Sequence, residues 1–523
     1  MIITDTKESK NIDNLISKKY RIPSNIRMEV AGLEAFRSIN SNFKPKKSLI
    51  IIGTGNNGGD GLVVGRYMLI NNMQCDIFMI QNSKKTSIDF KNNKKIVQKL
   101  NINFLKSLNK SKILEYDLIV DAIFGVGLNR DIQTNSPIYR TIKLINESKK
   151  TICSLDCPSG LCSSSGKTLG ISVLAELTIT FDSLKTGLIN DPGYKNSKNI
   201  HLINIGAPYE VFKKIKNTYL DNYEIKKIIK PRSVSGNKGT FGHTLIIGGC
   251  KEMPGAVIIA ALSAYKAGCG LVTICVPKVI SRIIKNKVPE AIVIEMDVSD
   301  DGCYFNHINF IKSLKNKLRK KPSAIVIGPG MGNKTYLKEI ILKTIKEFNS
   351  KFILDADALN CLNESIKDLH QYNRDIIITP HPGEMASLTG KTIKEIQENR
   401  IQNAELLAKK SNMIIVLKGF RTVICSLKDG THINSSGSSA MATGGMGDSL
   451  SGIIGSFLAQ GYKTIDAAKL GVFLHGKSGD VLLNKKHNRG ILARDIIRVL
   501  PEAIHSLVEN SALEVKNYIK NEN

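Results

Sequence analysis

The chain has 523 residues, which is too many for one ordinary hydrophobic core, so two or three domains are expected. Hydrophobic residues make up 42% of the sequence and aromatic residues 6%, as is typical of soluble globular proteins. No apolar run approaches the roughly 18 residues of a membrane helix, and the N-terminal segment lacks the apolar core of a secretory signal. We therefore expect a cytoplasmic protein with no membrane partner.

The net charge is +28, from 74 basic and 46 acidic side chains. The lysines are spread in short pairs between apolar segments, which indicates solvated surfaces rather than a nucleic-acid groove, so no nucleic-acid partner is predicted. The nine histidines form no metal-binding spacing, and the ten cysteines are scattered. Reduced thiols are therefore expected, several of them in the core.

The first glycine-rich segment lies between a buried strand at 48–53 and a helix that we expect to begin near Leu62. The segment itself, 54–61, reads TGNNGGDG, and a strand, a glycine loop and a helix in this order commonly cradle phosphates. The next strand, 75–80, is followed by Gln81, where a dinucleotide-binding dehydrogenase usually carries an acid for the ribose. This difference argues against ordinary hydride transfer.

Polar residues follow several predicted strands of the first half. Besides an opening helix at 25–41 and the strands already described, strands are predicted at 117–125, 151–156, 176–181 and 200–206. Strands alternating with helices predict a parallel sheet covered on both faces, with ligands beyond the carboxyl ends of the strands. The segment 54–61, Asp121 and Asp156 are then expected to converge on one crevice, although each alone also fits a helix cap or turn.

A lysine-, proline- and glycine-containing stretch separates the two halves. We predict a first domain at 1–220, a linker at 221–235 and a second domain at 236–515. The second series comprises strands at 243–249, 271–276, 291–296, 323–330, 351–357, 375–384 and 413–425, a helix from Pro254 to Gly268, two helices after Gly445 and a last helix near 490–508. This alternation predicts a second α/β domain.

The segment 443–452, TGGMGDSLSG, places three glycines before an acid and an apolar helix. We expect that helix to begin at Asp448 and to run to Gly461. A helix start offers unpaired N–H groups to an anion such as phosphate, and a carboxylate there suits proton removal from an attacking hydroxyl. The alternative is that Asp448 only caps the helix. Lys418 and Arg421, between two short strands, are candidate phosphate ligands.

These motifs resemble a known family. Similarity to the NAD(P)H-hydrate epimerase domain rests on TGNNGGDGLVVGR, DAIFGVG and SLDCPSG. Similarity to the ADP-dependent NAD(P)H-hydrate dehydratase rests on KGTFGHTLIIGG, MPGA, IGPGMG, LDADALN, ITPHPGEM, LKGFRT and ATGGMGDSLSG. In this order they resemble the bifunctional repair enzymes, which implies an α/β fold: an N-terminal Rossmann-like three-layer domain and then a ribokinase-like α/β domain. Val126 stands where threonine is usual, and Cys157 where an apolar residue is more usual.

The resemblance implies repair of NADH or NADPH that carries water at C6 of the nicotinamide ring. The first domain would interconvert the R and S hydrates. The second would use ADP as co-substrate to phosphorylate the hydroxyl of the S form, after which phosphate leaves and NAD(P)H and AMP remain. It also implies K⁺ in the epimerase domain and Mg²⁺ in the dehydratase domain, and we expect a homo-oligomer.

The family's functional residues carry over to matching positions here. The implied K⁺ ligands are Asn57, Asp121 and Ser159. The implied hydrate-binding residues are Asn56, Asn57, Gly58, Gly59, Asp60, Gly125, Val126, Gly127, Leu128, Asn129, Arg130, Asp131 and Asp156 in the first domain, and Ala256, Gly332, His381 and Asp448 in the second. The implied nucleotide-binding residues are Lys418, Gly419, Phe420, Arg421, Thr422 and Gly447. Asp448 and Asp156 are the candidate catalytic residues.

Two alternatives remain at this point. The chain could be a ribokinase-type kinase of a small molecule, such as a vitamin precursor, with a non-catalytic N-terminal domain. The N-terminal half could instead be a non-catalytic scaffold that associates with RNA, for which the net charge of +28 gives some support. Such a scaffold would have no need of Asn57, Asp121, Asp156 and Ser159.

Overall fold

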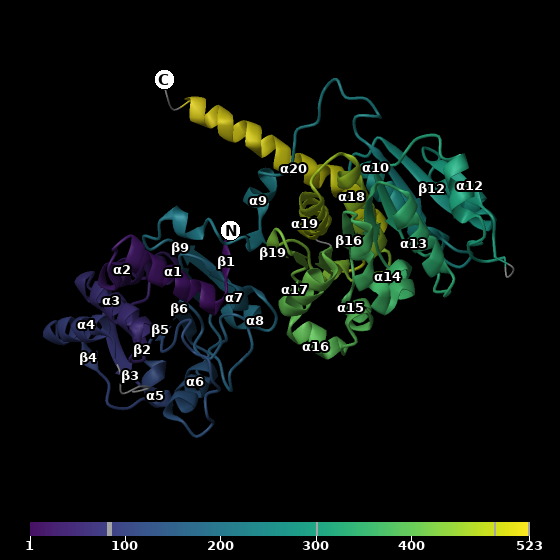
Figure 1. The fold of residues 1–523 in the computed structure, drawn as a ribbon. Helices are drawn as coiled ribbons and strands as arrows, with labels where there is room; N and C mark the ends of the chain where they lie inside the picture. The colour runs from purple at the N-terminus through teal and green to yellow at the C-terminus, as the bar shows by residue number, and fades with distance from the viewer. Residues whose placement is uncertain (81–85, 300–301, 486–487, 521–523) are drawn as a thin grey trace. The chain divides into compact units, whose positions relative to one another are not determined.

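The computed structural model describes residues 1–80, 86–299, 302–485 and 488–520. The chain divides into two compact units, Met1–Asn217 and Thr218–Asn523 (Figure 1). Gln81, on which the argument against hydride transfer rested, lies outside the described residues. Within the described part of the chain, no helix combines the length and the apolar character needed to cross a membrane.

The first unit is built on a seven-stranded sheet in which every pair is parallel. In spatial order its strands are β4 (Asn103–Phe104), β3 (Gln74–Met79), β2 (Lys47–Ile52), β5 (Leu118–Ala122), β6 (Thr151–Leu155), β7 (Leu177–Phe181) and β9 (Asn199–Ile203). A separate parallel pair joins β1 (Ile3–Thr4) to β8 (Leu184–Lys185). The N-terminus is thereby tied to the segment that follows β7.

Helices cover both faces of this sheet, because successive side chains of a buried strand point to opposite sides. Ile50 of β2 packs in the core that includes α2 (Ser24–Phe43), α3 (Asn56–Ile70) and α4 (Ile88–Lys99). Ile51 packs in the core that includes α5 (Lys110–Leu114) and α6 (Pro137–Glu147). The remaining helices of this unit are α1 (Thr6–Lys19), α7 (Thr186–Ile189) and α8 (Gly193–Ser197). The predicted three-layer α/β architecture is confirmed for this unit.

One local prediction was wrong: the glycine-rich segment is not a loop up to Leu62, because α3 already begins at Asn56. Its glycines allow the first turns to pack directly on the sheet. A Cβ atom at Gly58 would lie 2.0 Å from the carbonyl oxygen of Gly53, and one at Gly61 would lie 2.6 Å from the Cβ atom of Ala122. The helix start therefore sits tight against the ends of β2 and β5.

The second unit is built on a ten-stranded sheet. In spatial order its strands are β10 (Thr218–Leu220), β19 (Gly430–Asn434), β18 (Val423–Ser426), β17 (Ile414–Leu417), β16 (Ile376–Ile378), β15 (Lys351–Leu354), β14 (Ala324–Ile327), β11 (His243–Ile247), β12 (Leu271–Pro277) and β13 (Ile292–Met296). The pairs from β17 to β13 are parallel, whereas β17, β18 and β19 form an antiparallel meander. The antiparallel edge brings the segment 418–422 to the carboxyl end of the sheet.

Helices again cover two faces. One core contains residues of α10 (Pro254–Lys266), α18 (Met446–Ala459), α19 (Thr464–Asn484) and α20 (Ala493–Lys520). The opposite core contains residues of α12 (Phe310–Lys317), α13 (Leu337–Glu347), α14 (Asp357–Leu362), α15 (Pro382–Thr389), α16 (Ile393–Glu398) and α17 (Arg400–Ser411). Two shorter helices are α9 (Asn222–Lys226) and α11 (Ser281–Lys287). The predicted α/β class holds for this unit as well.

Several boundaries differ from the sequence-based ones, and three of these differences matter for the sites and the domains. The strand predicted at 375–384 is only β16, because Pro382 starts α15 and His381 caps it. The helix expected to open at Asp448 begins two residues earlier, after Gly445 in the left-handed conformation. The units divide after residue 217 rather than 220, because β10 pairs with β19 and so joins the second sheet, and the proposed linker 221–235 also lies within the second unit.

Candidate functional site

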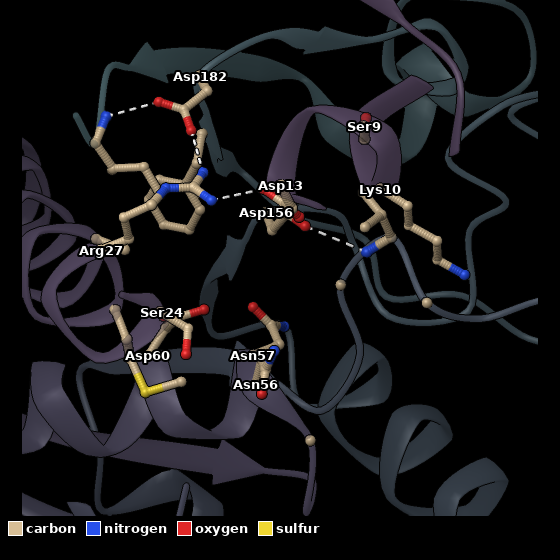
Figure 2. Close-up of a pocket in the computed structure, with 18 of the residues that line it drawn as sticks. Ser9, Lys10, Asp13, Ser24, Arg27, Asn56, Asn57, Asp60, Asp156 and Asp182 are labelled. Carbon is tan, nitrogen blue, oxygen red and sulfur yellow. Dashed lines mark hydrogen bonds and ion pairs between the residues drawn. The ribbon is translucent and has the colours of Figure 1, made fainter. Parts of the chain in front are cut away.

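The first unit contains a cavity of about 500 Å³ at the carboxyl ends of β2, β5, β6 and β7 (Figure 2). The predicted residues that line it are Asn56, Asn57, Asp60, Gly125, Val126, Gly127 and Asp156. Side chains of α1 and α2, among them Asp13 and Arg27, form a further wall. Residues of the segment 54–61 and Asp156 therefore meet in one crevice as expected, whereas Asp121 does not line it.

Not every predicted residue of this unit reaches the cavity. Gly58 and Gly59 are buried, and a Cβ atom at Gly59 would lie 2.6 Å from the sulfur of Met28. The four residues that follow Gly127 also lie outside the lining set: Leu128, Asn129, Arg130 and Asp131. Their assignment to hydrate binding thus stays a prediction from resemblance.

Next to the cavity, three oxygen-bearing side chains lie on neighbouring segments. Asp121, at the end of β5, is fully buried and accepts hydrogen bonds from Ser159 Oγ (2.6 Å) and Ser159 N (2.9 Å). Burial raises the pKa of Asp121, and hydrogen bonds from Ser159 and Ser154 oppose that rise. The side-chain oxygen and nitrogen of Asn57 are both buried without a hydrogen-bond partner. A buried amide without hydrogen-bond partners lowers the stability of the fold unless a ligand or an ion binds it.

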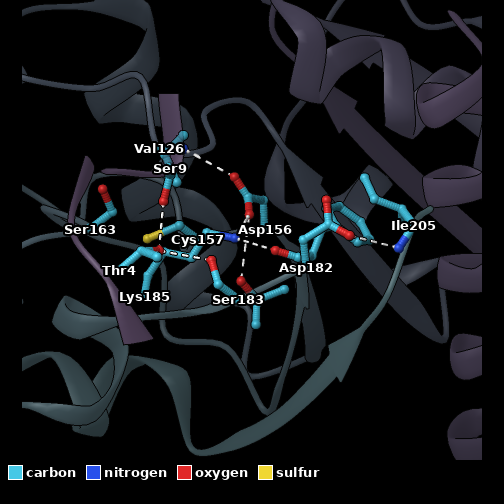
Figure 3. A network of polar contacts seen from close by, with 12 residues as sticks. Thr4, Ser9, Val126, Asp156, Cys157, Ser163, Asp182, Ser183, Lys185 and Ile205 are labelled. Carbon is cyan, nitrogen blue, oxygen red and sulfur yellow. Dashed lines mark hydrogen bonds and ion pairs between the residues drawn. The ribbon is translucent and has the colours of Figure 1, made fainter. Parts of the chain in front are cut away.

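Asp156 follows β6 and has a backbone φ of 61°, in the left-handed region that non-glycine residues rarely adopt. This conformation turns its carboxylate into the cavity. Oδ1 lies 2.9 Å from Lys185 Nζ, and Oδ2 accepts a hydrogen bond from Val126 N at 3.2 Å (Figure 3). Gly125 leaves room for this contact, because a Cβ atom there would lie 2.7 Å from Asp156 Oδ2.

A second acid, Asp60, lines the same cavity from α3. Burial raises its pKa well above the ordinary value, and the charge of Asp156 raises it further. The surroundings of Asp60 therefore disfavour its charged form, whereas Asp156 contacts a cation.

In the second unit, a buried charge cluster surrounds Lys418, which follows β17. Lys418 Nζ lies 2.7 Å from Asp355 Oδ1 and 3.7 Å from Glu384 Oε2. Burial disfavours the charge on Asp355, but Lys418 and the hydroxyl of Ser451 outweigh that effect and lower its pKa. Burial, together with the charge of Asp355, raises the pKa of Glu384 to about 7 despite the opposing effect of Lys418. Neither Asp355 nor Glu384 is among the site residues that we predicted from the sequence.

Asp448 occupies the third position of α18, close to this cluster. Burial, and then the charge of Asp355, raise the pKa of Asp448 to about 7, against the effect of Lys418. A Cβ atom at the preceding residue, Gly447, would lie 3.3 Å from Lys418 Nζ. The glycines thus bring the N–H groups at the start of α18 beside a buried ammonium group.

A second cavity, of about 430 Å³, extends from this helix start. Its lining includes all the predicted nucleotide-binding residues: Lys418, Gly419, Phe420, Arg421, Thr422 and Gly447. Arg421 Nη1 donates to the carbonyl oxygen of Ser435 at 2.9 Å, so part of its guanidinium is already engaged by the chain. His475 of α19 also lines this cavity with a buried, unpartnered Nε2 atom, and burial lowers its pKa to about 4.

The remaining predicted residues of the second unit lie at neighbouring strand ends and helix starts. Ala256 is in the first turn of α10, and a Cβ atom at Gly330 would lie 2.9 Å from its methyl group. Gly332 N donates to Asp357 Oδ2 at 2.8 Å. His381 Nδ1 accepts hydrogen bonds from the first backbone N–H groups of α15. Burial and Lys418 lower the pKa of His381, so it is neutral at pH 7.

Sequence reasoning missed the cations that hold the acids in place. Lys185 lies outside every motif that we recognised, and it meets Asp156 only because β8 follows β7, the strand next to β6. Arg27, on α2, pairs with Asp13 and Asp182 from two other segments. Such contacts between distant segments leave no local pattern, so no sequence signal could have found them.

These two units define a class of protein: a chain with two α/β domains, each of which has acidic side chains in or beside a cavity near the carboxyl ends of its strands. Comparison of the sequence with known protein families agrees with this two-domain description. Residues 24–187 match the family described as YjeF-related protein N-terminus, and residues 244–502 match the NAD(P)H-hydrate dehydratase family.

Relatives match over almost the whole chain. The bifunctional NAD(P)H-hydrate repair enzyme Nnr of Moorella thermoacetica is 33% identical over 97% of this chain and 98% of its own. The Escherichia coli enzyme of the same name is 32% identical over 91% of this chain and 88% of its own. The ADP/ATP-dependent NAD(P)H-hydrate dehydratase from Bacillus subtilis is 27% identical over 55% of this chain and 98% of that structure, with a TM-score of 0.48. The chain belongs to the family of bifunctional NAD(P)H-hydrate repair enzymes, so the resemblance seen in the sequence is confirmed.

Proposed function

We propose that each unit carries one step of the repair of hydrated NADH and NADPH. The first unit interconverts the R and S hydrates in the cavity that contains Asp60 and Asp156. The second unit dehydrates the S hydrate at the expense of ADP, which occupies the cavity lined by residues 418–422. The long match to bifunctional relatives favours this function over a vitamin kinase or an RNA scaffold.

In the dehydratase step, Asp448 accepts the proton of the C6 hydroxyl while that oxygen attacks the terminal phosphorus of ADP. A carboxyl group whose pKa is about 7 is well matched to a proton transfer at neutral pH. Lys418 and the N–H groups at the start of α18 stabilise the negative charge on the phosphoryl group. Phosphate then leaves C6 and a proton leaves C5, which restores the dihydronicotinamide.

Mg²⁺ fits the dehydratase cluster because it prefers carboxylates together with substrate phosphates. The carboxylates of Asp355 and Glu384 flank Lys418, so these two residues would hold the ion beside the phosphates of ADP. Bound Mg²⁺ would neutralise charge on the phosphates.

K⁺ fits the epimerase unit for a different reason. The buried amide of Asn57 has no hydrogen-bond partner, and Asp121 and Ser159 add oxygen atoms, which are the ligands that a hard cation prefers. We propose that these three residues hold K⁺ and thereby fix the strand ends that frame the cavity.

The observation that carries the proposal is Asp448, an acid with a raised pKa at the glycine-lined start of α18, beside the cavity that we assign to ADP. The test supplies purified R or S hydrate to the whole chain. The S hydrate with ADP should yield NAD(P)H and AMP, and the R hydrate should do so only after epimerisation. A requirement for ATP and a pyrimidine alcohol, with no use of hydrates, would overturn it. We also propose a homo-oligomer, which light scattering would test.

A further inference from the structure

The two acids of the epimerase cavity differ in their surroundings. Asp156 contacts three groups that favour a negative charge: Lys185 Nζ at 2.9 Å, Val126 N at 3.2 Å and Thr180 Oγ1 at 3.5 Å (Figure 3). Lys185 is only 3% exposed, and its Nζ also donates to the carbonyl oxygen of Phe181 at 2.7 Å. The ammonium group is therefore held in one place by two partners.

Asp60 has no such support. None of the described residues donates a hydrogen bond to its carboxyl group or pairs with it, although it lines the cavity. The charged groups around it are Asp156, Arg27, Asp13 and Asp89, and the only cation among them, Arg27, is already paired with Asp13 and Asp182. Burial and the three neighbouring acids keep the pKa of Asp60 well above its ordinary value, against the opposing effect of Arg27.

Two carboxyl groups of one cavity, one in contact with a cation and the other without a partner among the described residues, can serve as a base and an acid. Asp60 projects from α3, and Asp156 follows β6, so they reach the cavity from different elements (Figure 2). A substrate ring between them would meet a proton donor and a proton acceptor from different directions. This arrangement suits a reaction that removes a group from one face of a carbon and restores it on the other.

We propose that Asp60 and Asp156 are the acid and base of epimerisation, which proceeds by loss and re-addition of water at C6, and that Lys185 is a positioning residue that holds Asp156 as a carboxylate. This inference rests on the epimerase function of the first unit. C6 of the hydrate bears both the hydroxyl and the ring nitrogen N1, whose lone pair assists departure of the hydroxyl.

The step balances in atoms and electrons. Asp60 gives its proton to the hydroxyl oxygen, the C6–O bond breaks, and water leaves with the bonding pair while the N1 lone pair forms an N1=C6 bond. Water then attacks the other face of C6, the N1=C6 pair returns to N1, and Asp156 takes the proton that the incoming water loses. Exchange with solvent returns Asp60 to its acid form and Asp156 to its carboxylate. The opposite direction uses the same two groups with their roles reversed.

The first test is isotopic. The whole chain, without ADP so that dehydration is idle, receives one purified hydrate in water enriched in ¹⁸O. The expected product is the inverted hydrate with one labelled oxygen for each inversion, corrected for exchange without protein. Inversion with the original oxygen retained would overturn the proposal. No inversion at all by the wild-type chain would instead overturn the epimerase assignment, so the two failures are distinguishable.

The second test separates the roles of the residues. Asp60→Asn and Asp156→Asn should each lower the epimerisation kcat by about 10²–10⁴-fold, the usual contribution of a general acid or base. Asp76→Asn is the matched control, because Asp76 is a partly buried aspartate of β3 that lies outside the cavity lining. An Asp60→Asn variant that folds and keeps wild-type kcat would refute its role as the acid.

Lys185→Met and Lys185→Arg test the positioning role. The Met variant should lose kcat with little change in KM, because the Asp156 carboxyl group has lost the ammonium group that holds it in place. The Arg variant should recover part of kcat. If both variants change only the thermal stability of the unit, Lys185 is structural and this part of the proposal fails.

Discussion

At the residue scale, burial acts differently on acids that lie close together. Asp355 is buried but touches Lys418 and Ser451, so its pKa falls below the ordinary value. Asp448 is near the same ammonium group but is not bonded to it, and burial raises its pKa to about 7. In the other unit, Asp156 contacts Lys185, whereas Asp60 has no such contact in the described part of the chain and burial raises its pKa. The groups that an acid touches, together with its depth, therefore set its pKa.

Asp448→Asn should abolish dehydration and leave epimerisation intact, because the amide cannot accept the hydroxyl proton. The measurement is the rate of NADH formation from S hydrate and ADP, together with R-to-S conversion, in the same preparation. Asp466→Asn, in the first turn of α19, is the control and should keep both activities. Loss of both activities in a folded Asp448→Asn chain would contradict the two-site model.

Dehydration should also depend on pH through Asp448. Its carboxylate is the active form, so the rate should fall about tenfold for each pH unit below a pKa of about 7 and level off above it. This fall in rate at low pH is measured directly as the pH dependence of kcat for dehydration. A rate that stays constant down to about pH 5 would exclude Asp448 as the base.

The buried carboxyl group of Asp448 should also lower the free energy of unfolding of the second unit. Its folded-state pKa, about 7, lies above the ordinary value of 3.8, so the folded chain binds the extra proton and stability falls as pH rises from about 4 to about 7. Asp448→Asn should therefore stabilise the second unit by roughly 4 kcal/mol above about pH 7 and by little near pH 4. Calorimetry at the two pH values tests this. Equal unfolding temperatures of variant and wild type at both would contradict it.

At the element scale, glycines let helices approach their supports closely. Gly61 seats α3 on the sheet, and Gly452 of α18 lies against the backbone of α10, where a Cβ atom would come within 2.1 Å of the carbonyl oxygen of Ala260. In both units the element that carries a proposed catalytic acid is fixed in this way: Asp60 on α3 and Asp448 on α18. Packing of the helix therefore sets the position of the acid.

Gly452→Ala should destabilise the second unit by more than about 2 kcal/mol, since a backbone oxygen cannot move aside and the helix propensity gained is only about 1 kcal/mol. Gly444→Ala is the matched control, because a Cβ atom there would meet nothing within 4 Å. Denaturant unfolding of both variants provides the comparison. Similar midpoints for the two variants would show that α10 and α18 can separate without cost.

At the scale of the whole molecule, the two units have their own sheets and cores, and every residue of each described cavity comes from one unit. The division after residue 217 assigns β10 to the second sheet, where it pairs with β19 at the edge. Each activity should therefore survive separation of the units.

We expect the chains 1–217 and 218–523, expressed separately, to retain epimerisation and dehydration respectively. A second pair cut after residue 220 removes β10 from the second sheet and leaves an exposed edge at β19, so its dehydratase chain should be less stable. Activity assays and thermal unfolding of the four chains test this. A dehydratase chain that is equally stable after either cut would show that β10 contributes nothing.

The sequence by itself determined the class of each domain, the family and the strand ends where the polar residues gather. This was possible because local runs of residues, such as 48–61 and 443–452, are enough to predict buried strands and glycine turns. Confirmation from relatives covers family and function, whereas the individual site residues stay predictions.

Only the tertiary structure decided which acids contact a cation. Lys185 meets Asp156, and Lys418 meets Asp355, across 29 and 63 positions of the chain respectively (185 minus 156, and 418 minus 355). It also showed that α3 begins at Asn56 and that β10 belongs to the second sheet. The physical reason is that desolvation, ion pairing and strand pairing depend on which distant segments pack together, and no local pattern of residues specifies that.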